Sequence, residues 1–355
     1  MSVLHLLPTF DTGGLGSLGL TMIRAWPEKT RHMVIAPRYL RTKPDLFGAY
    51  AGLCGEGSVA QIDRHAYQTP PAWGALLANQ MAAFMRGQLP THVINYNFTD
   101  AVWNSFGIRA ATYKGAILSH VGTVLPDTKD TRLMATSQHH YATKFIPASE
   151  AARARLVTLG AKNVLPVVWN GVELSKYEHP VREQALTFGF TGRMAEIPVK
   201  DWRTLIEGFS KAAIPGSKLR IAGAGDGRAA IEALAKGAQN IEFVGNLRPD
   251  QIPAFLGTLD VFVMAALPIE GFSMAMVEGF ASRCLMLGTD VGSVREAFEP
   301  FGGETFLAPD AAKMAKLMKG LQKPETRAKN QAFVDAARSR LDATRMAKSY
   351  YDAGL

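Results

Sequence analysis

The chain has 355 residues, 47% of them hydrophobic and 20% charged, which is the balance of a soluble globular protein. Its length predicts two domains of roughly 150–200 residues each. No apolar run reaches the roughly 18 residues that span a bilayer, and the opening MSVLHLLPTFD lacks the basic region of a signal peptide. Because the two cysteines, Cys54 and Cys284, have no metal-ligand spacing, we expect reduced thiols in a cytoplasmic protein.

The formal charge of +8 is concentrated in the first half of the chain. Residues 1–171 contain 16 Lys and Arg against 9 Asp and Glu, a net charge of +7. Such an excess can attract an acidic substrate or an anionic membrane, here the inner face of the plasma membrane, and an ordinary solvated face explains it equally well. Nucleic acid is not an expected partner, because no basic stripe is interleaved with aromatic residues.

Apolar runs and helical patterns alternate along the chain, which predicts parallel sheets flanked by helices. In the first half, the expected strands are residues 2–8, 31–36, 58–62, 91–96, 113–119, 131–136 and 164–169, and the expected helices are residues 17–27, 71–87 and 149–159. In the second half, the expected strands are residues 185–191, 217–223, 241–244, 260–264 and 284–288, and the expected helices are residues 201–213, 227–237, 249–257 and 274–283. The sequence therefore predicts two doubly wound α/β domains in series.

The domain boundary is expected at NGVELSKYEHP, which combines a turn dipeptide, charges and a proline. We place the first domain at residues 1–175 and the second at residues 176–340. After residue 310 only helical patterns remain, and the last of them, residues 341–355, is expected to cross back onto the first domain.

A glycine-rich stretch near the start, Gly14-Leu15-Gly16-Ser17-Leu18-Gly19, has the G-x-G-x-x-G form of a dinucleotide-binding turn. Such a site also needs an acidic residue about 20 residues further on, at the end of the second strand. The segment MVIAPRY ends that strand without one, although Arg38 could serve the 2′-phosphate of NADP. An NAD(P)-dependent oxidoreductase therefore stays an alternative.

In the second half, polar and glycine residues follow the ends of the expected strands, where open α/β sheets bind ligands. Arg193 and Lys200 follow a strand that ends near Gly192, and two fixed cations suit a diphosphate. Gly223 and Gly225 lie between a strand and a helix N-terminus, where backbone N–H groups can approach a phosphate or a nucleoside.

The most specific element is AALPIEGFSMAMVEGFA. Glu270 is expected in a loop, Ser273 as the N-cap of the following helix, and Glu278 on that helix. The free N–H groups of the helix N-terminus would face an anion, and the carboxylates would accept hydrogen bonds from paired hydroxyls. A sugar nucleotide is a ligand of this kind.

Five consecutive blocks, TGRMAEIPVK, IAGAGDG, IEFVGNL, DVFVMAALPIEGFSMAMVEGFASRC and GTDVGSVREAF, resemble those of the family-4 retaining glycosyltransferases of the GT-B fold, in their nucleotide-sugar-dependent, bacterial form. VVWNGVEL resembles the family's block at the joint between domains. The resemblance covers about residues 165–300 in the right order. It implies two Rossmann-like domains facing each other across a cleft, with the acceptor on the first and the nucleotide sugar on the second.

The resemblance also implies roles for single residues. Glu278 would bind the ribose hydroxyls, Glu270 the hydroxyls of the donor sugar, and Arg193 with Lys200 the diphosphate. The other implied donor contacts are Gly13, Gly14, Gly16, Gly192, Gly223, Gly225, Asn246, Leu247, Gly271, Phe272, Ser273 and Met274.

Two departures from the family pattern concern Lys200. It lies one or two residues further from Arg193 than the family usually shows, and Asp201 replaces the glycine expected after the lysine. Arg203 is therefore an alternative to Lys200.

In the first domain, the family places a histidine or an acid near the reacting carbon of the sugar, and His120 ends an expected strand. Candidate acceptor contacts are Tyr96, Phe98 and Arg38, although the two aromatic rings could equally be core residues. Neither a cofactor nor a metal ion is expected, because in this family Arg and Lys replace the divalent cation.

These observations predict a metal-independent, retaining hexosyltransferase that uses a nucleotide-diphosphate sugar, with UDP favoured over GDP. The acceptor would be a hydroxyl of a saccharide or a lipid-linked molecule in cell-envelope polysaccharide or lipopolysaccharide biosynthesis. Besides the oxidoreductase, the alternatives are a sugar-nucleotide epimerase of the same architecture and a non-catalytic sugar-binding protein.

Overall fold

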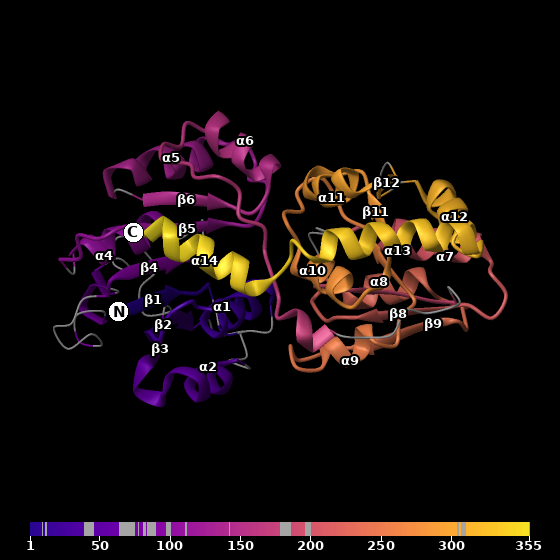
Figure 1. Ribbon diagram of the computed structural model, residues 1–355, viewed down its shortest axis with the longest axis horizontal. Coiled ribbons are helices and arrows are strands. Elements are labelled where there is room, and N and C mark those ends of the chain that lie inside the picture. The colour runs from indigo at the N-terminus through magenta and orange to yellow at the C-terminus, as the bar shows by residue number, and fades with distance from the viewer. Residues whose placement is uncertain are drawn as a thin grey trace. The chain divides into compact units, whose positions relative to one another are not determined.

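The computed structural model divides the chain into two compact units, the first made of Met1–Trp169 with Ala343–Leu355 and the second of Asn170–Asp342 (Figure 1). It describes residues 1–8, 10, 13–38, 46–63, 75–76, 78–80, 83, 90–96, 101–110, 112–141, 143–177, 186–195, 200–303, 305–306 and 310–354. The boundary expected after residue 175 lies a few residues later along the chain than this division.

The first unit is built on a six-stranded parallel sheet in the order β3-β2-β1-β4-β5-β6. Its strands are β1 (Ser2–Leu6), β2 (Arg31–Arg38), β3 (Val59–Asp63), β4 (His92–Asn95), β5 (Ile117–Val121) and β6 (Thr143–Pro147). This is the strand order of a doubly wound Rossmann sheet. Every residue of β4 and β5 is buried, as expected for central strands covered on both faces.

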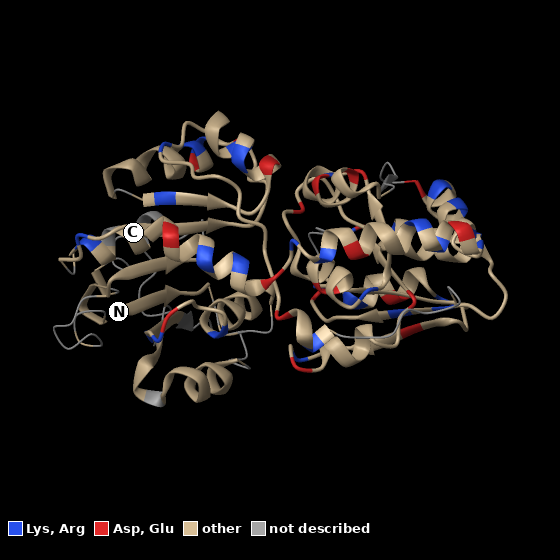
Figure 2. Ribbon diagram, viewed as in Figure 1, with Lys and Arg blue, Asp and Glu red and all other residues tan. Residues whose placement is uncertain are grey.

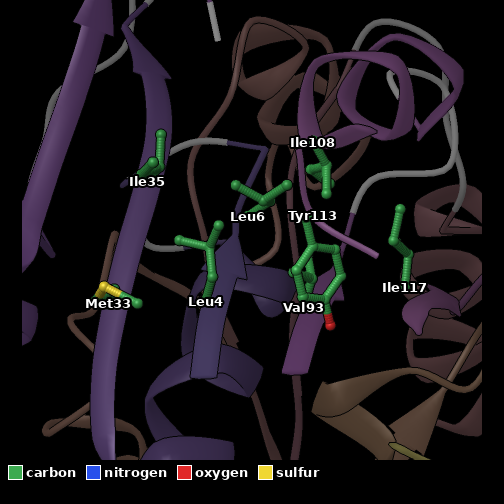
Figure 3. Packing of buried hydrophobic residues seen from close by; sticks show 8 residues of the cluster. All are labelled: Leu4, Leu6, Met33, Ile35, Val93, Ile108, Tyr113 and Ile117. Atoms are coloured by element: carbon green, nitrogen blue, oxygen red, sulfur yellow. The ribbon is translucent and has the colours of Figure 1, made fainter. Parts of the chain in front are cut away.

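One core cluster of the first unit lies on the sheet and under its helices (Figure 3). It contains Leu4, Leu6, Met33, Ile35, Val93, Ile108, Tyr113 and Ile117, which come from four neighbouring strands and the segments beside them. Burying each such side chain contributes roughly 1.5–3 kcal/mol. This packing fixes the strand ends to which the candidate residues of this unit are attached.

The first unit carries the helices α1 (Gly14–Arg24), α2 (Phe47–Cys54), α4 (Ala101–Ala110), α5 (Lys129–Ser137), α6 (Glu150–Thr158) and α14 (Ala343–Gly354). Helix α14 is the C-terminal one, and it buries Met346, Ala347 and Tyr350. Lys144 Nζ on β6 donates a 2.8 Å hydrogen bond to the carbonyl oxygen of Ala353. The C-terminal helix therefore belongs to the first unit, as predicted from the sequence.

The second unit repeats the same topology. Its strands β7 (Thr187–Thr191), β8 (Lys218–Ala222), β9 (Ile241–Gly245), β10 (Val261–Met264), β11 (Leu285–Thr289) and β12 (Thr305–Phe306) form a parallel sheet in the order β12-β11-β10-β7-β8-β9. Its helices are α7 (Trp202–Ala212), α8 (Arg228–Leu234), α9 (Ile252–Leu256), α10 (Met274–Ala281), α11 (Gly292–Phe298), α12 (Ala311–Gly320) and α13 (Pro324–Arg338). The two doubly wound sheets that the sequence predicts are confirmed.

The strand positions predicted for the second half are confirmed to within two residues for β7 to β11. The first half was predicted less well. Residues 131–136, expected as a strand, lie in α5, because Thr128 and Thr131 form a capping box that starts a helix there. The expected strand at 164–169 is reduced to a single bridge between Val164 and Phe145.

Further differences lie in the first unit. Strand β6 and helices α2 and α4 were not predicted, and the strand expected at 113–119 is β5, a few residues later. Helix α1 begins at Gly14 instead of Ser17, so Gly14 and Gly16 lie in its first turn and not in a loop. Most of the helix expected at 71–87 lies outside the described residues.

Candidate functional site

In the second unit, the candidate residues follow the carboxyl ends of neighbouring parallel strands. Lys200 comes after β7, and Glu270 and Ser273 come after β10, which pairs with β7 in the sheet. The backbone of Lys200 forms a bridge with Ala266. Because the chain is anchored here, the unusual spacing between Arg193 and Lys200 does not keep the lysine from the loop after β10.

The ammonium group of Lys200 lies between two oxygen ligands. It forms an ion pair with Glu270 Oε2, and it donates a 3.0 Å hydrogen bond to Ser273 Oγ. The side chains of both Lys200 and Glu270 are only 10% exposed. Little water can screen a pair this buried, so the three groups form one rigid polar cluster. The role expected for Lys200, binding the donor diphosphate, stays a prediction.

Arg203, the alternative to Lys200, lies elsewhere. It is exposed on α7 and pairs with Glu207 of the same helix at 3.3 Å. Asp201, which directly follows Lys200, is the N-cap of α7. Its carboxylate accepts a 3.1 Å hydrogen bond from the backbone N–H of Thr204. The aspartate that replaces the expected glycine is thus a helix cap.

Ser273 occupies the N-cap position of α10, as predicted, but its hydroxyl does not cap the helix. The hydroxyl oxygen accepts its bond from Lys200 instead. The backbone N–H groups in the first turn of a helix have no partner within that helix, and they carry the positive end of its dipole. The N-terminus of α10 therefore combines Lys200 with backbone donors, an arrangement that favours an anion.

Two side chains hold the loop before α10 from behind. Asn170 Nδ2 donates a 2.7 Å hydrogen bond to the carbonyl oxygen of Phe272, and Ser293 Oγ donates one to the carbonyl oxygen of Gly271. In a trans peptide the N–H points opposite to the C=O. The N–H groups of Phe272 and Ser273 are therefore directed away from Asn170 and Ser293.

Glu278 lies on α10 and is buried. Its Oε1 accepts a 3.4 Å hydrogen bond from the hydroxyl of Tyr177, which belongs to the short helix Leu174–Tyr177. Burial raises the pKa of Glu278 to about 8, and the hydrogen bond from Tyr177 lowers it only in part. A carboxyl group kept away from water in this way gains from ligand hydroxyls that can donate to it.

The glycines after β7 and β8 bring two loops into direct contact. A Cβ atom on Gly223 would lie 2.0 Å from the carbonyl oxygen of Gly192, and one on Gly225 would lie 2.1 Å from the carbonyl oxygen of Met194. Close packing of the two loops therefore explains why these positions are glycine, independently of any ligand. Arg193 is exposed beside them, as is Asn246 after β9, while Leu247 is half-buried.

In the first unit, His120 lies at the carboxyl end of β5 and is buried. Its Nδ1 lies 2.7 Å from the hydroxyl oxygen of Tyr350 on α14. Its Nε2 has no hydrogen-bond partner among the residues that the structure describes. Burial lowers the pKa of His120 to about 4, so the ring is neutral near pH 7.

The other candidates of the first unit fall into three groups. Tyr96 is buried with its hydroxyl 3.0 Å from Nδ1 of His5, which makes it the core residue of the two alternatives. Phe98 and the side chain of Arg38 lie outside the described residues. Gly13 is the N-cap of α1, where its carbonyl oxygen accepts a bond from the N–H of Ser17.

Sequence reasoning missed four polar residues that contact the predicted ones, namely Asn170, Tyr177, Ser293 and Tyr350. Only Asn170 gave a signal, through the turn dipeptide that it forms with Gly171. The others are single polar residues in helical segments, and nothing local in the sequence distinguishes them from surface positions.

The described residues contain no group of three or more His, Cys, Asp and Glu side chains that could hold a metal ion. Among the helices that the structure describes, none is both long enough and apolar enough to cross a bilayer.

The family model described as "Glycosyl transferases group 1" matches residues 185–323, which is most of the second unit. No curated protein sequence matches the chain.

Several solved structures match almost the whole chain, among them the following three. HepE from Anabaena in complex with UDP and glucose has a TM-score of 0.81 at 15% identity, over 99% of each chain. A glycosyltransferase from Rickettsia africae has a TM-score of 0.77 at 16% identity, over 99% of this chain and 97% of that one. Sucrose-phosphate synthase from Thermosynechococcus elongatus has a TM-score of 0.75 at 14% identity, over 99% of this chain and 98% of that one. These likenesses confirm the predicted GT-B fold.

Proposed function

We propose that this chain, a glycosyltransferase of the GT-B fold, moves a hexosyl unit from a nucleotide-diphosphate sugar to an acceptor hydroxyl with retention of configuration. The observation that carries the proposal is the cluster of Lys200, Glu270 and Ser273 at the N-terminus of α10, with Glu278 buried on the same helix. It offers cationic and N–H donors to phosphates and carboxylates to sugar hydroxyls.

In this proposal Lys200 and the N-terminus of α10 stabilise the diphosphate as it leaves, and Arg193 adds a second cation. Lys200 pairs with Glu270, so its ammonium group is desolvated and fixed by the protein itself. Preorganised groups of this kind contribute about 3–4 kcal/mol each to a transition state.

The retaining step requires little else from the protein. The bond between the anomeric carbon and the diphosphate oxygen breaks, and the acceptor oxygen forms a bond to that carbon on the same face. The acceptor proton passes to the departing phosphate oxygen, which removes the need for a separate general base. Arg193 and Lys200 supply the positive charge, and a divalent metal is not needed.

The neighbouring structures support a uridine nucleotide. HepE was solved with UDP and with UDP-glucose, and TarM from S. aureus was solved with UDP and a glycosylated glycerol. We therefore propose a UDP-sugar in preference to a GDP-sugar, with Glu278 accepting hydrogen bonds from the ribose hydroxyls.

A thermal-shift screen against UDP, GDP, their sugars and NAD(P) tests the donor assignment. UDP is expected to stabilise the wild-type chain, and Glu278→Ala and Arg193→Ala are expected to lose most of that shift. The anomeric configuration of the product, read by NMR, tests retention. No shift with any nucleotide would refute the donor site, and a shift with NAD(P) alone would establish the oxidoreductase instead.

The acceptor is proposed to be a saccharide or a lipid-linked molecule at an anionic membrane, in the synthesis of envelope polysaccharide or lipopolysaccharide. Leu133 on α5 and Val157 on α6 are 67% and 58% exposed. Arg132 donates a 3.3 Å hydrogen bond to the carbonyl oxygen of Thr158, which brings the two positions to neighbouring parts of the surface. Helices α5 and α6 carry Lys and Arg positions with acidic positions among them (Figure 2), and Arg132 and Arg153 pair with Asp127 and Glu150. Exposed apolar side chains on helices that also carry basic residues suit contact with acidic lipid.

A further inference from the structure

The hydrogen bond between His120 and Tyr350 joins residues that are 230 positions apart, from β5 and the C-terminal helix α14. Both side chains are buried, with 1% exposure each. Nε2 of His120 has no hydrogen-bond partner among the described residues. The imidazole therefore bonds to the protein through Nδ1 alone, and Nε2 is left to bond to a ligand.

The partner of Nδ1 decides which nitrogen carries the proton. Burial lowers the pKa of His120 to about 4 and raises the pKa of Tyr350, so both groups are neutral near pH 7. A neutral imidazole has one donor and one acceptor nitrogen. The Tyr350 hydroxyl contacts His120 and is otherwise enclosed, and a buried O–H needs an acceptor. It therefore donates to Nδ1, which leaves the proton of the imidazole on Nε2.

We propose that Tyr350 is a positioning residue that holds His120 in its Nε2–H form, so that the ring offers a hydrogen-bond donor to a hydroxyl oxygen of the sugar substrate. This inference rests on the proposed function for the identity of that substrate. The tautomer itself is a property of the chain and is measured without one.

A second observation points to a ligand at Nε2. Gly122 lies two residues after His120, and a Cβ atom there would lie 2.8 Å from Nε2. Glycine thus keeps any side chain at position 122 off this nitrogen. A buried N–H with no protein partner is costly, and an oxygen supplied by a ligand removes that cost.

Helix α14 is fixed at further points, which keeps the Tyr350 hydroxyl in place. Tyr351, the next residue, donates a 2.6 Å hydrogen bond to Glu28, and Lys144 holds the carbonyl oxygen of Ala353. Tyr351 is therefore a matched control, since it is also a tyrosine of α14 but its hydroxyl bonds to Glu28 and not to His120.

The experiment compares Tyr350→Phe with Tyr351→Phe in the full chain. Long-range ¹H–¹⁵N NMR of histidine-labelled protein reports the tautomer, with the His120 signal assigned by its loss in His120→Gln. Tyr350→Phe is expected to convert His120 partly to the Nδ1–H form and to lower kcat about 10–100-fold while KM for the donor changes little. Tyr351→Phe is expected to leave both unchanged.

A second variant acts on the other nitrogen. Gly122→Ala is expected to lower kcat by crowding Nε2 while the bond from Tyr350 and the Nε2–H form persist. The proposal is overturned if His120 stays in the Nε2–H form in Tyr350→Phe, or if the two tyrosine variants have equal kinetics. Absence of transferase activity in the wild type would refute the proposed function, but the NMR result would still decide the role of Tyr350.

Discussion

The two units share one strand order but differ in the chemistry that follows their strands. In the second unit, charged side chains pair with each other at the ends of β7 and β10, as Lys200 does with Glu270. In the first unit, the ends of β4 and β5 carry the neutral Tyr96 and His120. The same topology therefore places a buried ion pair at the strand ends of one unit and uncharged side chains at those of the other.

This difference fits a division of labour within one reaction. In the proposed reaction a departing diphosphate needs fixed positive charge before the bond breaks, and Lys200 of the second unit is proposed to supply it. A sugar hydroxyl needs only a well-placed neutral donor or acceptor. Substitutions in the second unit should therefore affect the chemical step more strongly than those in the first.

The largest effect is expected for Lys200→Met. The variant keeps the apolar stem but removes the ammonium group, which leaves the buried Glu270 without its ion-pair partner. We expect kcat to fall about 10²–10³-fold, since one preorganised donor to the leaving group is lost. Steady-state kinetics with the UDP-sugar identified by the screen measures this change.

The control is Arg203→Met, three residues further on, because Arg203 is exposed and pairs with Glu207. It should change kcat by less than about twofold, as surface ion pairs contribute little. Equal losses in the two variants would show that Lys200 acts only through stability, which thermal unfolding measures directly.

The second effect concerns Glu278 and pH. Because burial raises the pKa of this carboxyl group to about 8, it is mostly protonated at pH 7 in the free protein. Ribose hydroxyls that donate to the ionised form lower its pKa on binding. We therefore expect UDP to release a proton as it binds at pH 7, and its affinity to rise between pH 6 and 8. Calorimetry in buffers of different ionisation enthalpy detects the proton.

As pH rises, the free energy of unfolding should fall, whereas the affinity for UDP should rise. The folded pKa of Glu278, about 8, lies above its ordinary value of 4.5, so the folded state holds a proton that the unfolded state releases. The free energy of unfolding contributed by this group is fully present below pH 4.5 and is lost as pH rises towards 8. Glu278→Gln, which cannot ionise, should gain stability over the wild type across this range and should bind UDP without the part of the pH dependence that this carboxyl group causes. A variant that follows the wild-type pH curve would contradict both predictions.

The second unit could be predicted from the sequence better than the first for a physical reason. Its strands and helices alternate without long insertions, and Asp201 and Asp310 act as ordinary helix caps. In the first unit, the apolar and β-branched residues of TRLMATS resemble a strand. The capping box formed by Thr128 and Thr131 is the local feature that favours a helix there. Local pattern alone did not settle that competition.

The site divides in the same way. Lys200, Glu270 and Glu278 lie in short motifs whose residue types suggest their chemistry. Asn170 and Tyr350 reach their partners across 102 and 230 positions. A hydrogen bond between distant residues leaves no periodicity or spacing in a single sequence, so only the fold reveals it.

The third effect tests the backbone donors of the second unit. Asn170→Ala removes the hydrogen bond to the carbonyl oxygen of Phe272, so the peptide before α10 is less well oriented. We expect kcat/KM for the donor to fall about 10-fold. Asn330→Ala is the control, because Asn330 also bonds backbone groups, at Met286 on β11. Both variants should lose about 1–3 kcal/mol of stability, and only Asn170→Ala should lose activity.

The smallest effect concerns the surface of the first unit. If the basic charge of this unit serves a membrane and not the chemical step, Leu133→Glu and Val157→Glu should reduce retention on liposomes of acidic lipid. They should leave kcat on a soluble acceptor unchanged, because both side chains are exposed on helices. Ile269→Glu is the matched control, an exposed apolar residue of the second unit at 46% exposure.

Retention should fall with salt, since each lipid contact of a Lys or Arg contributes only about 1 kcal/mol. If the wild type is not retained at low salt, or if Ile269→Glu weakens retention as much as the other two, the charge of the first unit belongs to an ordinary solvated surface. The contrast between the units would then rest on their strand ends alone.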